Sequence, residues 1–298
     1  MAPRPVAVIG LGCIGGSLAR ALIAQEVEVR GWSASPSDRE QAAAARVHVS
    51  TADDGASAAC AGAGIVVLAV PIRTVAEVAD SVRPALARNA KLLHVCGLQS
   101  RDALGVDDDT HALLLGTHPL AGSHDTGFGA SRPELFVDAV ISAEERADPR
   151  HRACIEWLWH TVGARRVDYR SAEAHDRLMA WVSQLPQLTA TALAATLAAG
   201  GIEARTIGSG ARDTTRLAAS DLGSWPTLLA GAPRELDAAL ELLGNTISDL
   251  RSALGSGDGE ALAAIWNSGR AWRREGARTA GAPSLQRERD ANRAEQGA

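Results

Sequence analysis

Several side chains that carry chemistry in other proteins are scarce in this sequence. Its 298 residues include one lysine, Lys91, four cysteines and no block of basic residues, and the formal net charge is −5. A catalytic lysine therefore has a single candidate, and nucleic acid is not an expected partner. The cysteines show no paired spacing, which predicts reduced thiols in a cytoplasmic protein and gives no indication of a metal site; they are Cys13, Cys60, Cys96 and Cys154.

Long apolar runs are also missing. The longest, over residues 64–72, is too short to cross a bilayer. The N-terminus leads directly into an expected strand without the architecture of a signal peptide, so we expect no membrane partner. With 46% hydrophobic residues over this length, the chain can bury one large core or two modest ones, and two domains are favoured.

Short apolar runs alternate with helical patterns in the first part of the chain. Strands interleaved with helices predict a parallel, doubly wound sheet of the α/β class. After about residue 170 the pattern becomes almost entirely helical. The expected strands are residues 6–10, 27–31, 47–49, 65–70, 91–95, 111–115 and 137–142.

One apolar stripe in the helical part is unusually regular. Its members are spaced four, three, four, three and four residues apart, which predicts one face of a long helix. The stripe needs a partner surface, either within the chain or in a dimer interface. It consists of Leu236, Leu240, Leu243, Ile247, Leu250 and Leu254.

A glycine pattern lies between the first expected strand and the first expected helix. Gly10, Gly12 and Gly15 have the spacing that permits a tight turn, close approach of a pyrophosphate and close packing of helix on strand, with Ile14 at the helix start. In this context the pattern predicts a dinucleotide site, and Val70 and Pro71, which close the fourth expected strand, lie where the nicotinamide half is expected. The predicted organisation is a Rossmann-type domain over residues 1–170, a helical substrate and dimerisation domain over 171–275 and a flexible tail over 276–298.

The end of the second strand leaves the cofactor open between NAD and NADP. An acidic residue is expected there to bind the ribose, about 20 residues after the glycines, but Ser33 occupies the position. Ser33, Ser35 and Arg39 could bind a 2′-phosphate, while Asp38 could reach back to the ribose. NAD is slightly favoured.

A histidine follows the sixth expected strand. His118 belongs to residues 116–122, Gly-Thr-His-Pro-Leu-Ala-Gly, which open an irregular stretch that ends near Pro133. The carboxyl edge of such a sheet binds ligands, and a histidine there can accept a proton at neutral pH. A buried structural histidine is the alternative.

These residues and two later segments resemble the prephenate and arogenate dehydrogenases. The family's G-x-H-P-M-A-G segment matches around His118, and its following loop matches at Gly127, Ala130, Leu135 and Phe136. Its E-x-H-D helix, which continues to S-x-L-P, matches residues 173–186, and its D-x-T-R…W segment matches residues 213–225. With the glycine pattern, the resemblance extends from residue 6 to about 255.

The resemblance implies an oxidative decarboxylation. A hydride passes from ring carbon C4 of a cyclohexadienyl acid to NAD(P)⁺ while the carboxylate at C1 leaves. By the same resemblance His118 takes the proton of the C4 substituent, Arg216 holds the substrate carboxylate, and Asp213 and Trp225 line the pocket. A guanidinium suits this role because it pairs bidentately with a carboxylate. The family habit also implies a homodimer.

The chain departs from the family at four polar positions. Two histidines of the helix are Gln184 and Gln187, the serine near the nicotinamide is Gly97, and His124 stands where an acidic residue is common. Glutamine stays neutral and offers both an acceptor and a donor, which would suit a substrate that carries an amine. The specific candidate is 4-amino-4-deoxyprephenate, a precursor of aminophenylalanine-derived antibiotics. Prephenate and arogenate, which both carry a C4 hydroxyl, are the competing substrates.

Two other functional classes share features with this sequence. Related reductases with a helical second domain need a catalytic lysine after the sheet, and Lys91 precedes a strand in the first domain. A nucleotide-binding sensor or scaffold with a decayed site would explain the lost histidines and serine. His118 and Arg216, both retained, favour the enzyme.

Overall fold

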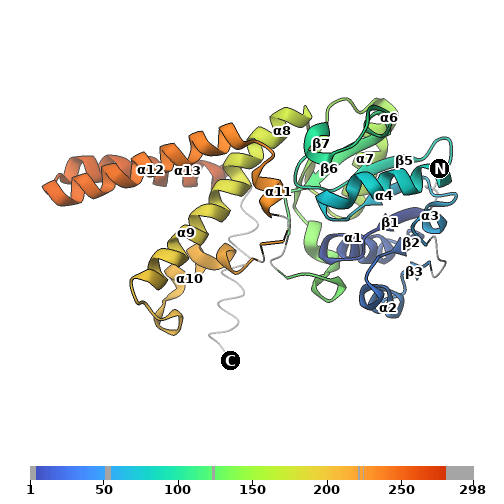
Figure 1. Cartoon of the computed structure of the whole chain (residues 1–298), viewed down its shortest axis with the longest axis horizontal. Helices are drawn as coiled ribbons and strands as arrows, with labels where there is room; N and C mark the ends of the chain where they lie inside the picture. The colour runs from blue at the N-terminus through green and yellow to red at the C-terminus, as the bar shows by residue number, and fades with distance from the viewer. Residues whose placement is uncertain (1–4, 51–54, 123–124, 221, 224, 280–298) are drawn as a thin grey trace. The chain divides into compact units, whose positions relative to one another are not determined.

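The computed structural model describes residues 5–50, 55–122, 125–220, 222–223 and 225–279 (Figure 1). The chain divides into two compact units, Met1–Leu236 and Asp237–Ala298. The predicted domain boundary near residue 170 lies inside the first unit, and that boundary remains a prediction.

An eight-stranded sheet forms the centre of the first unit, in the order β3-β2-β1-β4-β5-β6-β7-β8. The first six strands are parallel, and β7 pairs with β6 in the antiparallel sense. The predicted α/β class with a doubly wound, mostly parallel sheet is therefore confirmed. The strands are β1 Val6–Ile9, β2 Val29–Trp32, β3 His48–Val49, β4 Ile65–Leu68, β5 Lys91–His94, β6 Leu114–Pro119, β7 Val140–Glu144 and β8 Arg166–Arg170.

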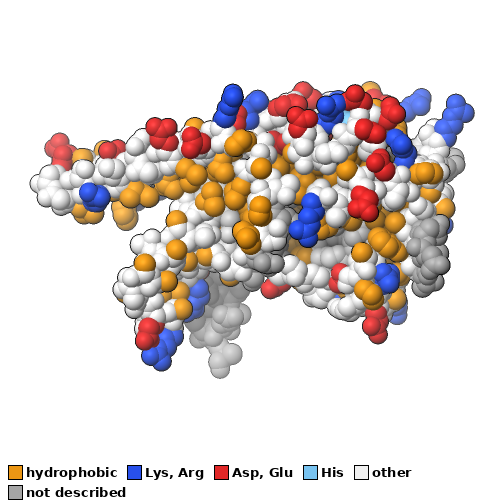
Figure 2. Space-filling view, in the orientation of Figure 1, with side chains coloured by type: hydrophobic (Ala, Val, Ile, Leu, Met, Phe, Trp, Pro, Cys, Tyr) orange, Lys and Arg blue, Asp and Glu red, His pale blue; other side chains and the backbone are white. Residues whose placement is uncertain are grey.

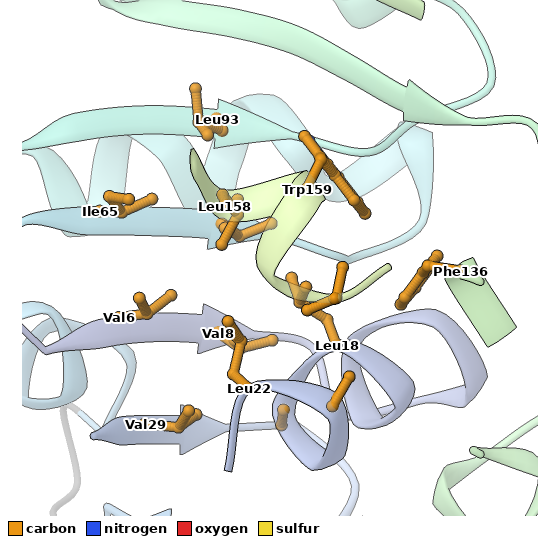
Figure 3. Close-up of a cluster of buried hydrophobic side chains, with 14 of the residues drawn as sticks. Val6, Val8, Leu18, Leu22, Val29, Ile65, Leu93, Phe136, Leu158 and Trp159 are labelled. Carbon is orange, nitrogen blue, oxygen red and sulfur yellow. The ribbon is translucent and has the colours of Figure 1, made fainter. Parts of the chain in front are cut away.

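Helices cover both faces of this sheet, so its central strands must be apolar on both sides. In β1, Val6 and Val8 pack with α1 (Cys13–Ala24) and α7 (Pro149–Thr161), as Figure 3 shows. Ala7 and Ile9 point to the other face and pack with α3 (Gly55–Cys60) and α4 (Val75–Val82). The two-residue period of a strand thus explains why VAVI is buried at every position.

Two predicted strands differ from the structure in their bounds, and one strand was not predicted. Residues 111–113 belong to a helix, α6 (Asp108–Leu113), because the Asp107 side chain accepts the Thr110 N–H and caps it. The strand that carries His118 consequently begins at Leu114. Strand β7 begins three residues later than expected, at Val140 rather than 137, and β8, rich in charged residues, was not predicted.

The helical region after residue 170 is confirmed and begins with one long run. Helix α8 (Ala172–Met179) passes through a π-helical turn, Ala180–Gln184, into α9 (Leu185–Ala199). Such wide turns occur frequently at functional sites. The remaining helices of the first unit are α2 Pro36–Ala44, α5 Arg101–Leu104, α10 Ser209–Thr215 and α11 Trp225–Leu229.

The second unit contains most of α12 (Pro233–Ser256) and all of α13 (Gly259–Thr279). The predicted long helix is confirmed as α12, and its stripe is largely uncovered: Leu240, Ile247 and Leu254 are 38%, 56% and 68% exposed. Hydrophobic side chains are visible along these helices in Figure 2. The predicted tail starts inside α13, and its residues 280–298 lie outside the described part. Among the described residues, no helix is long and apolar enough to cross a membrane.

Candidate active site

The turn after β1 is built for glycine. Gly10 has a φ of +95°, and a Cβ there would lie 2.4 Å from the Ala69 carbonyl oxygen. A Cβ on Gly15 would lie 1.8 Å from the carbonyl oxygen of Gly10. Both positions therefore exclude a side chain because strand, turn and helix pack so closely.

Gly12 differs, because a Cβ at this position would meet no atom within 4 Å. It is the N-cap residue of α1, where no side chain caps the helix and the first turn, which includes Ile14, holds no acidic residue. The backbone N–H groups are thus left for an external anion, and the open space over Gly12 fits a pyrophosphate. Val70 and Pro71 follow β4, and the Val70 side chain approaches Gly10.

The polar residues after β2 are largely engaged with the protein itself. The Asp38 carboxylate accepts the Phe128 N–H at 2.9 Å, which ties α2 to the loop after β6. Ser33 is buried, its hydroxyl accepts the Ser35 N–H at 3.3 Å, and its carbonyl accepts a hydrogen bond from Arg39. One oxygen of the Asp38 carboxylate is therefore already bound to the backbone, and its role toward the ribose remains a prediction.

A cavity of about 520 Å³ lies beyond the carboxyl end of β6. It brings together four residues predicted from the sequence, namely His118, Gln187, Arg216 and Trp225. A larger cavity of about 860 Å³ is lined by none of the predicted site residues. The smaller cavity is consequently the candidate substrate site.

The base candidate His118 is the first member of a hydrogen-bonded chain. Its Nδ1 lies 3.1 Å from Nε2 of His175, and Nδ1 of His175 lies 2.8 Å from the Asp176 carboxylate. That carboxylate also accepts the backbone N–H groups of Gln99 at 2.7 Å and Ser100 at 2.9 Å. Asp176 thus links helix α8 to the loop after β5.

Burial and neighbouring imidazoles set the charge of this cluster. Burial, with smaller effects from His175 and His94, lowers the pKa of His118 to about 3. The pKa of His94, fully buried on β5, is also lowered to about 3, first by burial and then by His175. Burial acts to raise the pKa of Asp176, but its hydrogen bonds outweigh this and hold the pKa below the ordinary value. At neutral pH His118 and His94 are therefore neutral, and both lie near the Asp176 carboxylate.

Arg216 supplies the cationic part of the cavity. It begins the short helix Arg216–Ala219 and is exposed. Within the described residues its guanidinium forms no ion pair or side-chain hydrogen bond, so its donors remain available to a ligand. Asp213, one turn earlier in α10, is exposed and does not line the cavity.

The two glutamines hold the segment that carries Arg216 and Trp225. Gln184 is 2% exposed, and its amide donates to the Leu228 carbonyl at 2.7 Å, whereas Gln187 is 7% exposed and donates to the Leu217 carbonyl at 2.9 Å. Only Gln187 lines the cavity. The expectation of two glutamines facing substrate is therefore reduced to one, with Gln184 bound to the backbone.

Gly97 lies beside the reactive end of His118. A Cβ at Gly97 would lie 4.0 Å from His118 Nε2 and 3.2 Å from the Leu228 side chain. Leu228 thus occupies space next to the position where the family has a serine. His124 lies outside the described residues.

His175 and Asp176 were not assigned a role from the sequence. Both are buried in α8, and neither lines the cavity. Their signal was the matching E-x-H-D segment itself, because two adjacent polar residues on an otherwise packed helix require partners.

Two family models match the chain. One, described as the nucleotide-binding domain of prephenate dehydrogenase, matches residues 18–168, and the other, described as its dimerization domain, matches residues 171–268. The chain belongs to the prephenate dehydrogenase family. It is accordingly an NAD(P)-dependent oxidoreductase, and the resemblance drawn from the motifs is confirmed.

Individual relatives agree. The chain is 32% identical to the cyclohexadienyl dehydrogenase of Zymomonas mobilis, over 87% of this chain and 91% of the relative. It is also 32% identical to the probable prephenate dehydrogenase NovF of Streptomyces niveus, over 86% of this chain and 71% of NovF. The fold matches prephenate dehydrogenase from Aquifex aeolicus, solved with hydroxyphenyl propionate and NAD⁺, with a TM-score of 0.81, 22% identity and coverage of 92% and 99%.

Gly12 offers a test of the cofactor cradle. Because a methyl group at Gly12 meets open space, Gly12→Ala should change the free energy of unfolding by less than about 0.5 kcal/mol. The same methyl enters the pyrophosphate site, so the Kd for NADH should rise at least about tenfold. Urea unfolding and NADH fluorescence measure the two effects. Gly15→Ala, whose Cβ clashes with Gly10, should instead destabilise the protein. Unchanged NADH binding by Gly12→Ala would contradict a pyrophosphate site over Gly12.

Proposed function

We propose that the chain oxidises and decarboxylates a prephenate-type cyclohexadienyl acid that carries an amine. The specific candidate is conversion of 4-amino-4-deoxyprephenate to 4-aminophenylpyruvate, with NAD as the preferred cofactor. Arogenate, whose amine lies on the side chain, and prephenate, which has none, are the competing substrates. The observation that carries the proposal is the hydrogen bonding of Gln187, which lines the cavity.

Gln187 has only one kind of group left for a substrate. Its amide NH₂ is committed to the Leu217 carbonyl at 2.9 Å, with a second, longer contact to the Thr191 hydroxyl at 3.4 Å. The remaining amide oxygen is an acceptor and carries no proton. An acceptor suits an N–H donor such as an ammonium group, whereas a histidine at this position could become cationic and repel it. The side chain therefore favours an amine-bearing substrate.

The residues of the cavity divide the chemical work. Within the described residues the guanidinium donors of Arg216 have no partner, and they would hold a substrate carboxylate. His118 would take a proton from the heteroatom on C4, since its imidazole is neutral at physiological pH. Bound NAD(P)⁺, held by the glycine turn, supplies the acceptor for the hydride that leaves C4. The C1–CO₂ bond breaks in the same process, and its electron pair enters the ring to make it aromatic.

The proton balance depends on the C4 substituent. A C4 hydroxyl loses its proton to His118 and regains it when the phenol forms, so no net proton is released. A C4 ammonium becomes a weakly basic arylamine, and one proton passes through His118 to solvent for each turnover. Proton release therefore distinguishes the two substrate classes independently of rate.

A decayed sensor is the candidate from another class. The loss of serine at Gly97 and of two histidines at Gln184 and Gln187 agrees with it. Against it, His118 and Arg216 line the same cavity, and a retained base beside a retained anion site has no purpose in nucleotide sensing alone.

The preference for NAD rests on the groups after β2. Ser33 and Arg39 hold each other through the Ser33 carbonyl, and Ser35 accepts the Asp38 N–H as the cap of α2. An extra phosphate would have to compete with these contacts and with the nearby Asp38 carboxylate. NAD makes no such demand.

A substrate panel tests the proposed function. Prephenate, arogenate and 4-amino-4-deoxyprephenate are compared by absorbance of the reduced cofactor. With NAD⁺ we expect kcat/KM to be highest for 4-amino-4-deoxyprephenate. For that substrate kcat/KM should be lower with NADP⁺ than with NAD⁺. Gln187→His should lower kcat/KM for the amino substrate at least about tenfold, a loss of one hydrogen bond to a charged group, while changing prephenate less. Equal or better turnover of prephenate or arogenate by the wild type would overturn the C4-amine assignment.

Arg216 has a matched control one turn away. Because a carboxylate clamp binds substrate and transition state alike, Arg216→Ala should raise KM about 10- to 100-fold with a smaller change in kcat. Arg212→Ala, an exposed arginine of α10 outside the cavity, should leave both constants unchanged. Steady-state kinetics measure both, and an unchanged KM in Arg216→Ala would place the carboxylate elsewhere.

We further propose a homodimer built through the helical part. The second unit has an apolar groove of about 680 Å³ between α12 and α13, lined by Leu250, Leu254, Leu262, Ile265 and Trp266. Leu254→Glu should shift the mass measured by light scattering at micromolar concentration from dimer toward monomer, since it introduces a charge into an apolar contact. Leu113→Glu alters a 48% exposed leucine of α6 and should leave the mass unchanged. A monomeric wild type would refute the homodimer.

A further inference from the structure

We propose that His175 and Asp176 are positioning residues that hold His118 in the tautomer whose bare Nε2 faces the cavity. The inference deepens the proposed function by explaining why His118 can act as a base. It rests on the hydrogen bonds among Asp176, His175 and His118. Each of these hydrogen bonds needs one donor and one acceptor, which determines the nitrogen that carries each proton. None of these contacts involves substrate or cofactor.

The Asp176 carboxylate accepts hydrogen bonds on both oxygens. One oxygen receives the Gln99 N–H, the other receives the Ser100 N–H, and both donors are backbone groups that cannot act as acceptors. A protonated carboxyl group would set its O–H against one of them. Asp176 is therefore ionised, and the hydrogen of its 2.8 Å contact must come from Nδ1 of His175.

The proton position on His175 determines the proton position on His118. In the proposed arrangement His175 is neutral, so that a proton on its Nδ1 leaves Nε2 bare and able only to accept. Nδ1 of His118, 3.1 Å away, must then be the donor. A neutral His118 that donates through Nδ1 has its lone pair on Nε2. The opposite tautomer would set two lone pairs against each other at that distance.

The bare nitrogen faces the reacting centre. Nε2 of His118 lies 4.0 Å from a Cβ built on Gly97, in the loop after β5, and His118 lines the cavity that contains Arg216. Nδ1 points the other way, toward His175. The hydrogen bonds that join His118, His175 and Asp176, here called the relay, thus leave Nε2 as the only nitrogen of His118 that a substrate in this cavity can contact.

The neighbouring histidine has the opposite tautomer. His94, on β5, accepts the Cys96 N–H through Nδ1 at 3.3 Å, so its proton is on Nε2. It is buried and neutral, and adds no charge next to His118. The charged group that acts on His118 is therefore the Asp176 carboxylate, through His175.

The relay also stabilises the charge that forms during reaction. The heteroatom–hydrogen bond of the substrate breaks, its proton binds Nε2, and His118 becomes an imidazolium that keeps its Nδ1–H. His175 and the Asp176 carboxylate then stabilise this cation through the existing hydrogen bonds. The proton afterwards returns to a hydroxyl product or leaves to solvent from an amine substrate. No reactant other than NAD(P)⁺ and substrate is needed.

The tautomers can be observed directly. Long-range ¹H–¹⁵N spectra of histidine-labelled protein at pH 7 should show His118 and His175 protonated at Nδ1 and His94 protonated at Nε2, with His118 and His94 assigned from the spectra of His118→Gln and His94→Gln. His94 is an internal control, because its tautomer is fixed by a separate contact. A His118 signal protonated at Nε2, or a cationic His175, would overturn the proposal.

Matched variants connect the tautomer to catalysis. His175→Phe keeps a ring but cannot accept the hydrogen bond from His118 Nδ1–H, so kcat should fall about 10²-fold while KM and NADH binding change little. His175→Gln can accept the His118 Nδ1–H through its amide oxygen and should recover at least about tenfold of that loss. Equal kcat in the two variants would show a merely structural role. The spectra need no substrate, so failure of the proposed function would leave the tautomer test intact.

Discussion

The hydrogen bonds of one carboxylate organise the candidate active site. Asp176 lies on the first helix after the sheet, yet its oxygens accept the backbone N–H groups of Gln99 and Ser100 at the end of β5. It therefore fixes the helical region against the nucleotide-binding sheet and, through His175, orients the side chain of His118. An ionised carboxylate this deeply buried requires such complete pairing, because an unpaired buried charge would cost several kcal/mol. The orientation of His118 depends on the position that Asp176 sets.

Two glutamine side chains hold the segment that contributes Arg216 and Trp225 to the cavity. Gln184 and Gln187 bind the carbonyls of Leu228 and Leu217, so the segment that bears Arg216 and Trp225 is held by amides rather than by imidazoles. Leu228 in turn packs against Gly97. The exchanges of histidine for glutamine and serine for glycine are therefore linked in space, although they are far apart in the sequence.

Periodicity and glycine spacing were sufficient for the fold class, the cofactor turn and the long apolar helix, since each depends on local geometry. The clustering of His118, Gln187, Arg216 and Trp225 followed from family motifs. The sequence could not indicate that Gln184 and Asp38 are bound to backbone groups, or that His175 and Asp176 support His118, because these contacts join residues 44, 90, 57 and 77 positions apart. Strand β8 was missed because three of its five residues, Arg166, Asp168 and Arg170, are charged.

The reaction class can be tested most directly by isotope transfer. Protein, NAD⁺ and a cyclohexadienyl acid deuterated at C4 are incubated, and the reduced cofactor and released CO₂ are measured by mass spectrometry. Oxidative decarboxylation at this site requires deuterium in the reduced nicotinamide and one CO₂ for each reduced cofactor, and both should disappear in His118→Ala. Cofactor binding without reduction by any of the three acids, or reduction without CO₂, would contradict an active dehydrogenase of this type.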